Sequence, residues 1–329
     1  MENKKENSFL NVIKAICAIL VVFIHCPFPG NLGIVVDVIA RIGVPIFLMI
    51  SGFYSYNNSK EKLMQKAKKI FKLMLYSYGI YIIIYMILNF ISDGEICNYI
   101  KRIFNIKQLV KFILFNESII CIPLWYLSAV LYSYLIYYKL NKNIKIIYVF
   151  TPILLVIHII VKEILFMYFD NEYSYLVRNF WLFGLPFFTL GHFINHYQEK
   201  IINSISNKQI IIFICLGIIL AILERYVRFA KHFYIGTIIS AILLFILTIK
   251  NPYYIHNRII EKIGKSDYTF IYLWHKLFIQ LVNHLHTNAK LWNYLKPIVV
   301  IILTVISSKI FNALRKILER KNQKKKEQY

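Results

Sequence analysis

Long apolar runs separated by short polar segments dominate the hydrophobic pattern of this chain. Most runs approach the roughly 20 residues that a helix needs to cross about 30 Å of hydrocarbon. Backbone N–H and C=O groups find no water inside a bilayer, so helices are the structure expected of such runs. The pattern predicts an all-α fold, a polytopic integral membrane helical bundle with about ten transmembrane helices, in one domain over residues 1–329. The expected spans lie near residues 9–26, 32–54, 73–91, 123–138, 146–166, 179–195, 209–223, 232–249, 267–284 and 297–314.

Composition agrees with a membrane protein and explains the large positive charge. The chain is 58% hydrophobic and only 17% charged, which is too apolar for an ordinary soluble domain, and its formal net charge is +23. Such a charge would suggest a nucleic-acid partner in a soluble protein. Here most of the 39 Lys and Arg residues fall in segments that would share one side of the membrane, including residues 60–72, 250–265 and a basic tail, 315–329. The positive-inside rule makes that side cytoplasmic, with both termini inside. The expected partner is therefore the lipid bilayer, and no nucleic acid.

Four ionisable residues lie inside the first two apolar runs, where such groups need an explanation. The step from Lys14 to His25 returns within roughly 20° of the same helix face, about 16 Å along the axis. Both side chains can therefore face one internal cavity. Asp37 and Arg41 are four residues apart, so they share a face and can neutralise each other.

The basic segment 60–72 leads into the third expected span and has two compatible interpretations. The simpler one is a topology anchor beside anionic lipids. The other is a rim that binds phosphates at the cytoplasmic mouth, formed by Lys68, Lys69 and Lys72.

Three further aromatic or histidine positions have both a structural and a functional interpretation. Trp125 and Tyr126 begin the fourth expected span, where aromatic anchoring in the headgroup region would explain them. His275 falls about halfway along the ninth span, so we expect it to be neutral and hydrogen-bonded or to line a hydrated cavity. Pro186 predicts a kink in the sixth span.

The sequence predicts no metal site. His192 and His196 have the spacing of a shared metal on a helix, but no third ligand accompanies them. The five cysteines contain no C-x-x-C pair. Cys97 and Cys121 share one expected external loop, and whether they pair stays open because sequence does not determine their geometry.

The pattern of the first hairpin strongly resembles the membrane-bound acyltransferase 3 family. It consists of Lys14, ten residues, His25 and then the run RIGVPIFLMISGF that starts at Arg41. The segments LWYL around Trp125 and YLWH ending at His275 resemble later segments of that family, so the resemblance covers nearly the whole chain. Members have about ten spans and move acyl groups, commonly acetyl from acetyl-CoA, onto sugars of exported glycans, lipids or antibiotics.

Carried over residue by residue, the resemblance makes His25 and Lys14 the catalytic candidates. The family usually has arginine where this chain has Lys14, and lysine keeps the charge but loses the bidentate fork. The candidates for binding the acyl-CoA are Lys68, Lys69, Lys72 and Arg41, and those for binding the acceptor are Trp125, Tyr126 and His275.

The function implied by the resemblance is that of an O-acyltransferase, an enzyme transferring groups other than aminoacyl groups. It would move an acyl group, expected to be acetyl, from cytosolic acyl-CoA to a hydroxyl of a cell-surface or exported carbohydrate, as a multi-pass protein of a bacterial cell membrane. Acyl-CoA would act as co-substrate, with no permanently bound cofactor. His25 would either take the acceptor's proton or carry the acyl group covalently.

A non-enzymatic alternative stays open at this stage. Similar hairpins occur in the membrane halves of serine racemases linked to glycopeptide resistance, where amino-acid uptake is proposed, and polysaccharide export is suggested for other relatives. The sequence selects neither the acceptor, nor the acyl group, nor the oligomeric state.

Overall fold

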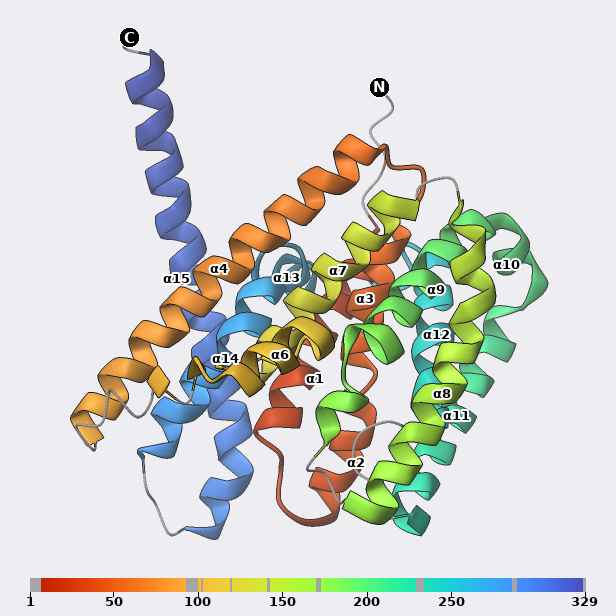
Figure 1. Ribbon diagram of the computed structural model, residues 1–329, viewed down its shortest axis with the longest axis horizontal. Coiled ribbons are helices and arrows are strands. Elements are labelled where there is room, and N and C mark those ends of the chain that lie inside the picture. Colours follow the sequence, from red (N-terminus) through yellow and green to blue (C-terminus); the bar gives the residue numbers. More distant parts are fainter. Residues whose placement is uncertain are drawn as a thin grey trace. The chain divides into compact units, whose positions relative to one another are not determined.

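The computed structural model describes residues 7–92, 100–101, 103–118, 120–140, 143–169, 173–228, 234–285 and 289–327. The fold is all-helical, with 86% of residues in helices and no strand within the described ranges (Figure 1). The all-α class predicted from the apolar runs is therefore confirmed.

Six helical segments of the described chain are long and apolar enough to cross a membrane. They are Ser8–His25, Gly30–Phe53, Lys60–Phe90, Lys145–Phe169, Asn207–Val227 and Lys290–Arg320, with Ile235–Lys250 as a shorter apolar helix. Three other expected spans appear as shorter helices. Two of these, α7 (Trp125–Leu140) and α14 (Tyr268–Asn283), have 16 residues each, which is about 24 Å against about 30 Å of hydrocarbon. The number of about ten spans therefore stays a prediction.

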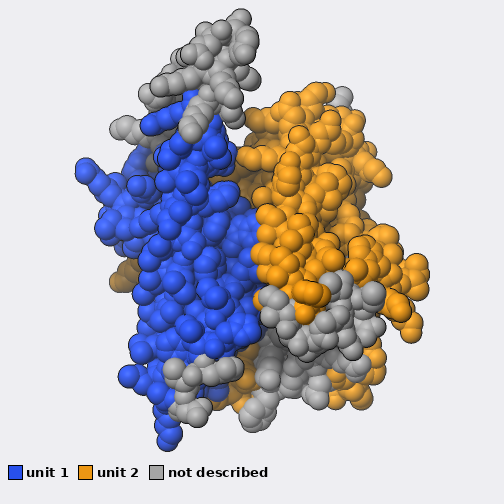
Figure 2. All heavy atoms as spheres, turned by 90° about the vertical axis from the view of Figure 1, so that its left-hand side faces the viewer, with its two compact units in different colours: residues 1–43, 244–329 blue, residues 44–243 orange. Residues whose placement is uncertain are grey.

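The chain divides into two compact units, coloured separately in Figure 2. Unit 1 comprises residues 1–43 and 244–329, and unit 2 comprises residues 44–243. The two ends of the chain thus belong to one unit.

Unit 1 is built around α1 (Ser8–His25), whose start is well defined. The Asn7 side chain accepts a hydrogen bond from Leu10 N at 2.7 Å, which caps the helix, and donates one to the backbone oxygen of Thr248 at 3.1 Å. The remaining helices of this unit are α2 (Gly30–Ala40), α13 (Arg258–Lys262), the π-helical turn η5 (Ile263–Asp267), α14 and α15 (Lys290–Glu327).

Helices α1 and α14 run in the same direction. Lys14 contacts Tyr268 near the start of α14, and His25 contacts His275 further along it. Asn312, late in α15, donates a hydrogen bond to Asp267 just before α14, so α15 runs the opposite way. These directions agree with the alternation that the ten expected spans require of the first, ninth and tenth.

A glycine allows the π-helical turn η5 to approach α1 closely. A Cβ atom at Gly264 would overlap the backbone oxygen of Asn11. Because a backbone carbonyl inside a helix cannot move aside like a flexible side chain, only glycine fits there.

We expect Gly264→Ala to destabilise the protein by roughly 1–3 kcal/mol, the usual cost of overpacking a tight contact. A thermal melt of the detergent-purified protein would measure it. Gly79→Ala is the matched control, since nothing lies within 4 Å of a Cβ at that helical position. If both variants melt alike, the close approach is not important for stability.

Unit 2 contains the helices from α3 to α12, although the first and the last of them each have residues in unit 1. Helices α3 (Gly43–Phe53) and α12 (Ile235–Lys250) each cross the boundary with unit 1. The others are α4 (Lys60–Ser92), α6 (Ile106–Phe115), the 3₁₀ turn η1 (Ile122–Leu124), α7, α8 (Lys145–Phe169), the 3₁₀ turn η3 (Ser174–Leu176), the π-helical turn η4 (Phe180–Gly184), α9 (Leu185–His196), α10 (Gln198–Ser204) and α11 (Asn207–Arg228).

The second expected span, residues 32–54, corresponds to the membrane-length apolar segment Gly30–Phe53, whose helix is interrupted once. Helix α2 ends at Ala40, and α3 begins at Gly43. Pro45 has no N–H, so it suits the first turn of a new helix, where donors have no intrahelical partner.

The irregularity expected at Pro186 is found in the turn that directly precedes this residue. Pro186 lies in the first turn of α9, and the irregularity precedes it as the π-helical turn η4. Residues 315–327 of the expected tail continue helix α15.

Candidate functional site

Helix α1 places Lys14 and His25 against α14, as the shared helix face predicts. Lys14 is half-buried, and its Nζ donates a hydrogen bond to Asn11 Oδ1 at 3.2 Å. The same ammonium lies 5.7 Å from the ring centroid of Tyr268, within the range of a cation–π contact. The lysine charge is therefore held by a polar and an aromatic neighbour inside unit 1.

His25 and His275 form a stacked pair of imidazole rings. Their centroids are 5.2 Å apart, and the planes are inclined by 27°. His25 ends α1 and is half-buried, whereas His275 is fully buried. Two histidines separated by most of the sequence thus meet at one end of the α1–α14 contact.

The surroundings of His275 determine its tautomer. Its Nδ1 lies 3.1 Å from the backbone oxygen of Ile271, and a carbonyl oxygen can only accept, so the ring proton is on Nδ1. In the neutral ring Nε2 is then an acceptor. Nε2 is buried without a hydrogen-bond partner among the described residues. A buried acceptor without a partner beside a second histidine suits a ligand that donates a proton or a hydrogen bond.

Asp37 and Arg41 form an ion pair at the end of α2. Arg41 Nη2 lies 2.8 Å from Asp37 Oδ1, and Nε lies 3.2 Å from Oδ2. The guanidinium edge formed by Nε and Nη2 therefore binds Asp37 within unit 1, as the four-residue spacing predicts. A role of Arg41 toward acyl-CoA stays a prediction.

Trp125 and Tyr126 lie at the start of α7, in unit 2. Trp125 is 5% exposed and packs edge to face on Phe183 at 5.5 Å. This burial contradicts the interpretation of Trp125 as an exposed interfacial anchor. The half-buried Tyr126 hydroxyl donates to the backbone oxygen of Phe47 at 3.3 Å and lies 3.5 Å from Ser51 Oγ.

Lys68, Lys69 and Lys72 lie on α4 and are exposed. The basic segment and the third expected span form one continuous helix, so these ammonium groups are carried on a rigid element. Exposure fits both the topology anchor and the phosphate rim.

The two histidines of α9 bind tyrosines. His192 Nδ1 lies 2.6 Å from the Tyr148 hydroxyl, and His196 Nδ1 lies 2.8 Å from the Tyr56 hydroxyl. Cys121 is buried, and Cys97 lies outside the described residues.

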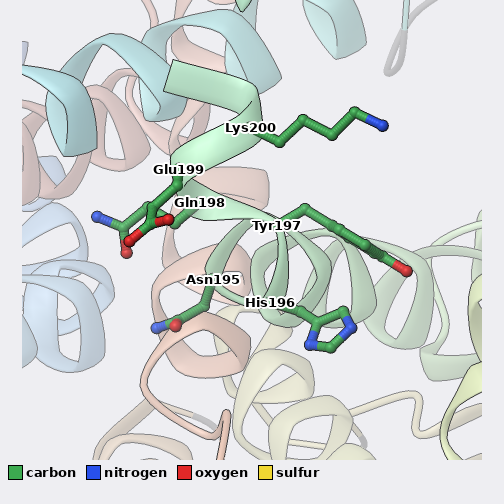
Figure 3. Close-up of a pocket in the computed structure, with 6 residues that line it drawn as sticks. All are labelled: Asn195, His196, Tyr197, Gln198, Glu199 and Lys200. Atoms are coloured by element: carbon green, nitrogen blue, oxygen red, sulfur yellow. The ribbon is translucent and has the colours of Figure 1, made fainter. Parts of the chain in front are cut away.

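A hollow of about 490 Å³ lies at the bend between α9 and α10. Figure 3 shows His196, Tyr197 and Lys200 on one side of the bend, with Asn195, Gln198 and Glu199 on the other. It contains none of the residues predicted to be catalytic or to bind ligands, so its size alone assigns it no role.

Sequence reasoning missed Tyr268 as a neighbour of Lys14. The signal was available, since Tyr268 and His275 are two helical turns apart on α14 and therefore share a face. Which other helix this face would meet could not be derived from its own pattern.

The comparisons with known proteins identify the family. The sequence profile of the acyltransferase 3 family, described as an acyltransferase domain, matches residues 7–312, nearly the whole chain. No curated protein and no solved structure matches the sequence. The matched region contains α1 with Lys14 and His25, and α14 with His275. This chain, with its several membrane-length apolar helices, belongs to the acyltransferase 3 family.

Proposed function

We propose that this membrane acyltransferase moves an acyl group, with acetyl as the first candidate, from cytosolic acyl-CoA to a hydroxyl of a cell-surface or exported carbohydrate. The observation that supports this most is the stacked pair of His25 and His275, 5.2 Å apart, with Lys14 on the same face of α1. Acyl transfer needs a base, a hydrogen-bond acceptor and a cation, and His25, His275 and Lys14 provide them on two packed helices.

In this mechanism His25 is the general base. Its imidazole takes the proton of the acceptor hydroxyl while the hydroxyl oxygen attacks the thioester carbonyl carbon. The new C–O ester bond forms, the C–S bond breaks, and the imidazolium returns the proton to the CoA sulfur. Proton transfer of this kind contributes typically 10²–10⁴ in rate.

His275 is a binding residue in this proposal. Its Nε2 accepts a hydrogen bond from a second hydroxyl of the carbohydrate acceptor, beside the one that reacts, because Nδ1–H is engaged by Ile271. A neutral His275 also leaves His25 without a second positive charge against its ring.

Lys14 supplies a fixed positive charge about three helical turns from His25, toward the predicted cytoplasmic end. It attracts the anionic part of acyl-CoA, and the exposed lysines of α4 stay candidates for binding its phosphates. Trp125 and Tyr126 stay candidates for the acceptor.

The test is acyl transfer by the purified protein. Incubated in detergent with radiolabelled acetyl-CoA, the protein should release CoA faster than buffer does, and faster still when a glycan acceptor from the producing cell is added. A transporter of amino acids or polysaccharide should show neither reaction. Solute uptake by reconstituted vesicles without any thioester consumption would contradict the proposal.

A further inference from the structure

A pocket of about 350 Å³ lies in unit 1 between η5 and the late part of α15. Lys262, Ser266 and Asp267 line it from one side, and the segment of α15 from Lys309 to Glu319 lines it from the other. The hydrogen bond from the Asn312 amide to Asp267 joins the two sides, so the pocket is part of the packed unit.

The pocket is strongly basic. Lys262, Lys309 and Lys316 are exposed, and the structure shows no ion pair for them within its described ranges. Arg315 also lines the pocket, but its Nε binds Glu319 at 2.8 Å. Three lysines that form no ion pair among the described residues favour an anionic ligand, and lysine binds phosphate as a compact point charge.

Asp267 places a second requirement on the ligand of this pocket. It is 2% exposed, and its Oδ1 accepts hydrogen bonds from Ser266 Oγ at 2.8 Å and from Asn312. Its Oδ2 is buried and has no hydrogen-bond partner in the described part of the chain. A carboxylate oxygen repels a bare phosphate, so this atom favours a ligand that also brings a hydroxyl or amine donor.

The pocket lies at the start of α14, about two helical turns from the candidate site. Asp267 directly precedes Tyr268, whose ring holds Lys14, and His275 follows about 12 Å further along α14. An extended phosphopantetheine arm is longer than this distance. A ligand with its phosphates in the pocket is therefore long enough to bring a thioester to the level of the two histidines.

We propose that this pocket binds the nucleotide end of acyl-CoA, with its phosphates on Lys262, Lys309 and Lys316 and a ribose hydroxyl or the adenine amine on Asp267 Oδ2. This inference rests on the proposed function, since it identifies where the donor of that reaction binds. It locates the main phosphate contacts on α13 and α15, in place of the lysines of α4.

The experiment measures binding of CoA and of 3′-dephospho-CoA to the full-length protein by calorimetry in detergent, without any acyl transfer. The unsubstituted protein should bind CoA about fivefold or more tightly than dephospho-CoA, as expected for a charge-assisted contact. The double variant Lys309→Gln/Lys316→Gln should lose this preference. Asp267→Asn should weaken both ligands by a similar factor.

The double variant Lys265→Gln/Arg320→Gln is the matched control, because it removes the same charge from exposed positions outside the pocket. The proposal fails if the pocket and control doubles bind CoA equally well. It also fails if only Lys68→Gln/Lys69→Gln/Lys72→Gln weakens CoA, or if the pocket double loses binding to anionic phospholipid vesicles while it keeps CoA. Transfer activity of the unsubstituted protein is scored separately, so a misplaced pocket is distinguishable from a wrong function.

Discussion

Replacement of His25 by alanine should lower the rate of acyl transfer by roughly two to four orders of magnitude, because it removes the group that takes the acceptor's proton. The measurement is the initial rate of acyl transfer at matched protein concentration. His25 is half-buried at the end of α1, so its removal should have little effect on yield or on the elution profile of the purified protein. A catalytic loss without a loss of folded protein is the expected signature.

His256→Ala is the matched control for this prediction. His256 is exposed and binds Glu261 outside the α1–α14 contact, so its removal should leave the rate unchanged. A His25→Ala protein that transfers at near the parent rate would show that the catalytic assignment is wrong. Acid-quenched mixtures with labelled acetyl-CoA and no acceptor test the covalent route: label retained on the parent protein and lost in the His25 variant would make His25 an acyl carrier.

His275→Phe should lower kcat/KM by about ten- to hundredfold, the range expected when a buried hydrogen bond to the bound acceptor is lost. Phenylalanine keeps a flat ring against His25 but has no acceptor at the position of Nε2. The loss should therefore appear with the carbohydrate acceptor and be small for acceptor-independent hydrolysis of acetyl-CoA. Both reactions can be followed by release of free CoA.

The same substitution at an exposed histidine, His284→Phe, controls for the added hydrophobicity. If His275→Phe transfers normally, His275 only supports the His25 ring by packing, and its Nε2 has no part in binding. If both reactions fall together and the protein melts at a lower temperature, the residue is structural.

Several features followed from the sequence alone because they depend on local geometry. The apolar runs determine an all-helical chain, since a backbone without water must bond to itself. The first helix, expected near residues 9–26, is Ser8–His25. The alignment of Lys14 with His25, and the pairing of Asp37 with Arg41, follow from the helical repeat and need no information from the rest of the chain.

The positions of helix breaks could not be derived from the hydrophobic pattern of the sequence. The run across residues 32–54 is apolar apart from Asp37 and Arg41 and the residues near its ends, and its hydrophobic pattern alone did not show that α2 and α3 are separate helices. The π-helical turn η4 likewise has the same composition as the helix that follows it. In both places the backbone geometry depends on packing against other helices.

Only the tertiary structure decided which helix faces which. His275 meets His25, and Tyr268 meets Lys14, because α14 packs in parallel against α1, with Gly264 permitting the close approach. Asp267 lines a basic pocket because the late part of α15 returns beside it. The hydrophobic pattern of a helix face indicates which residues are buried, but any apolar neighbour can bury them equally well. The neighbouring helix is therefore determined by long-range packing, which a hydrophobic pattern does not encode.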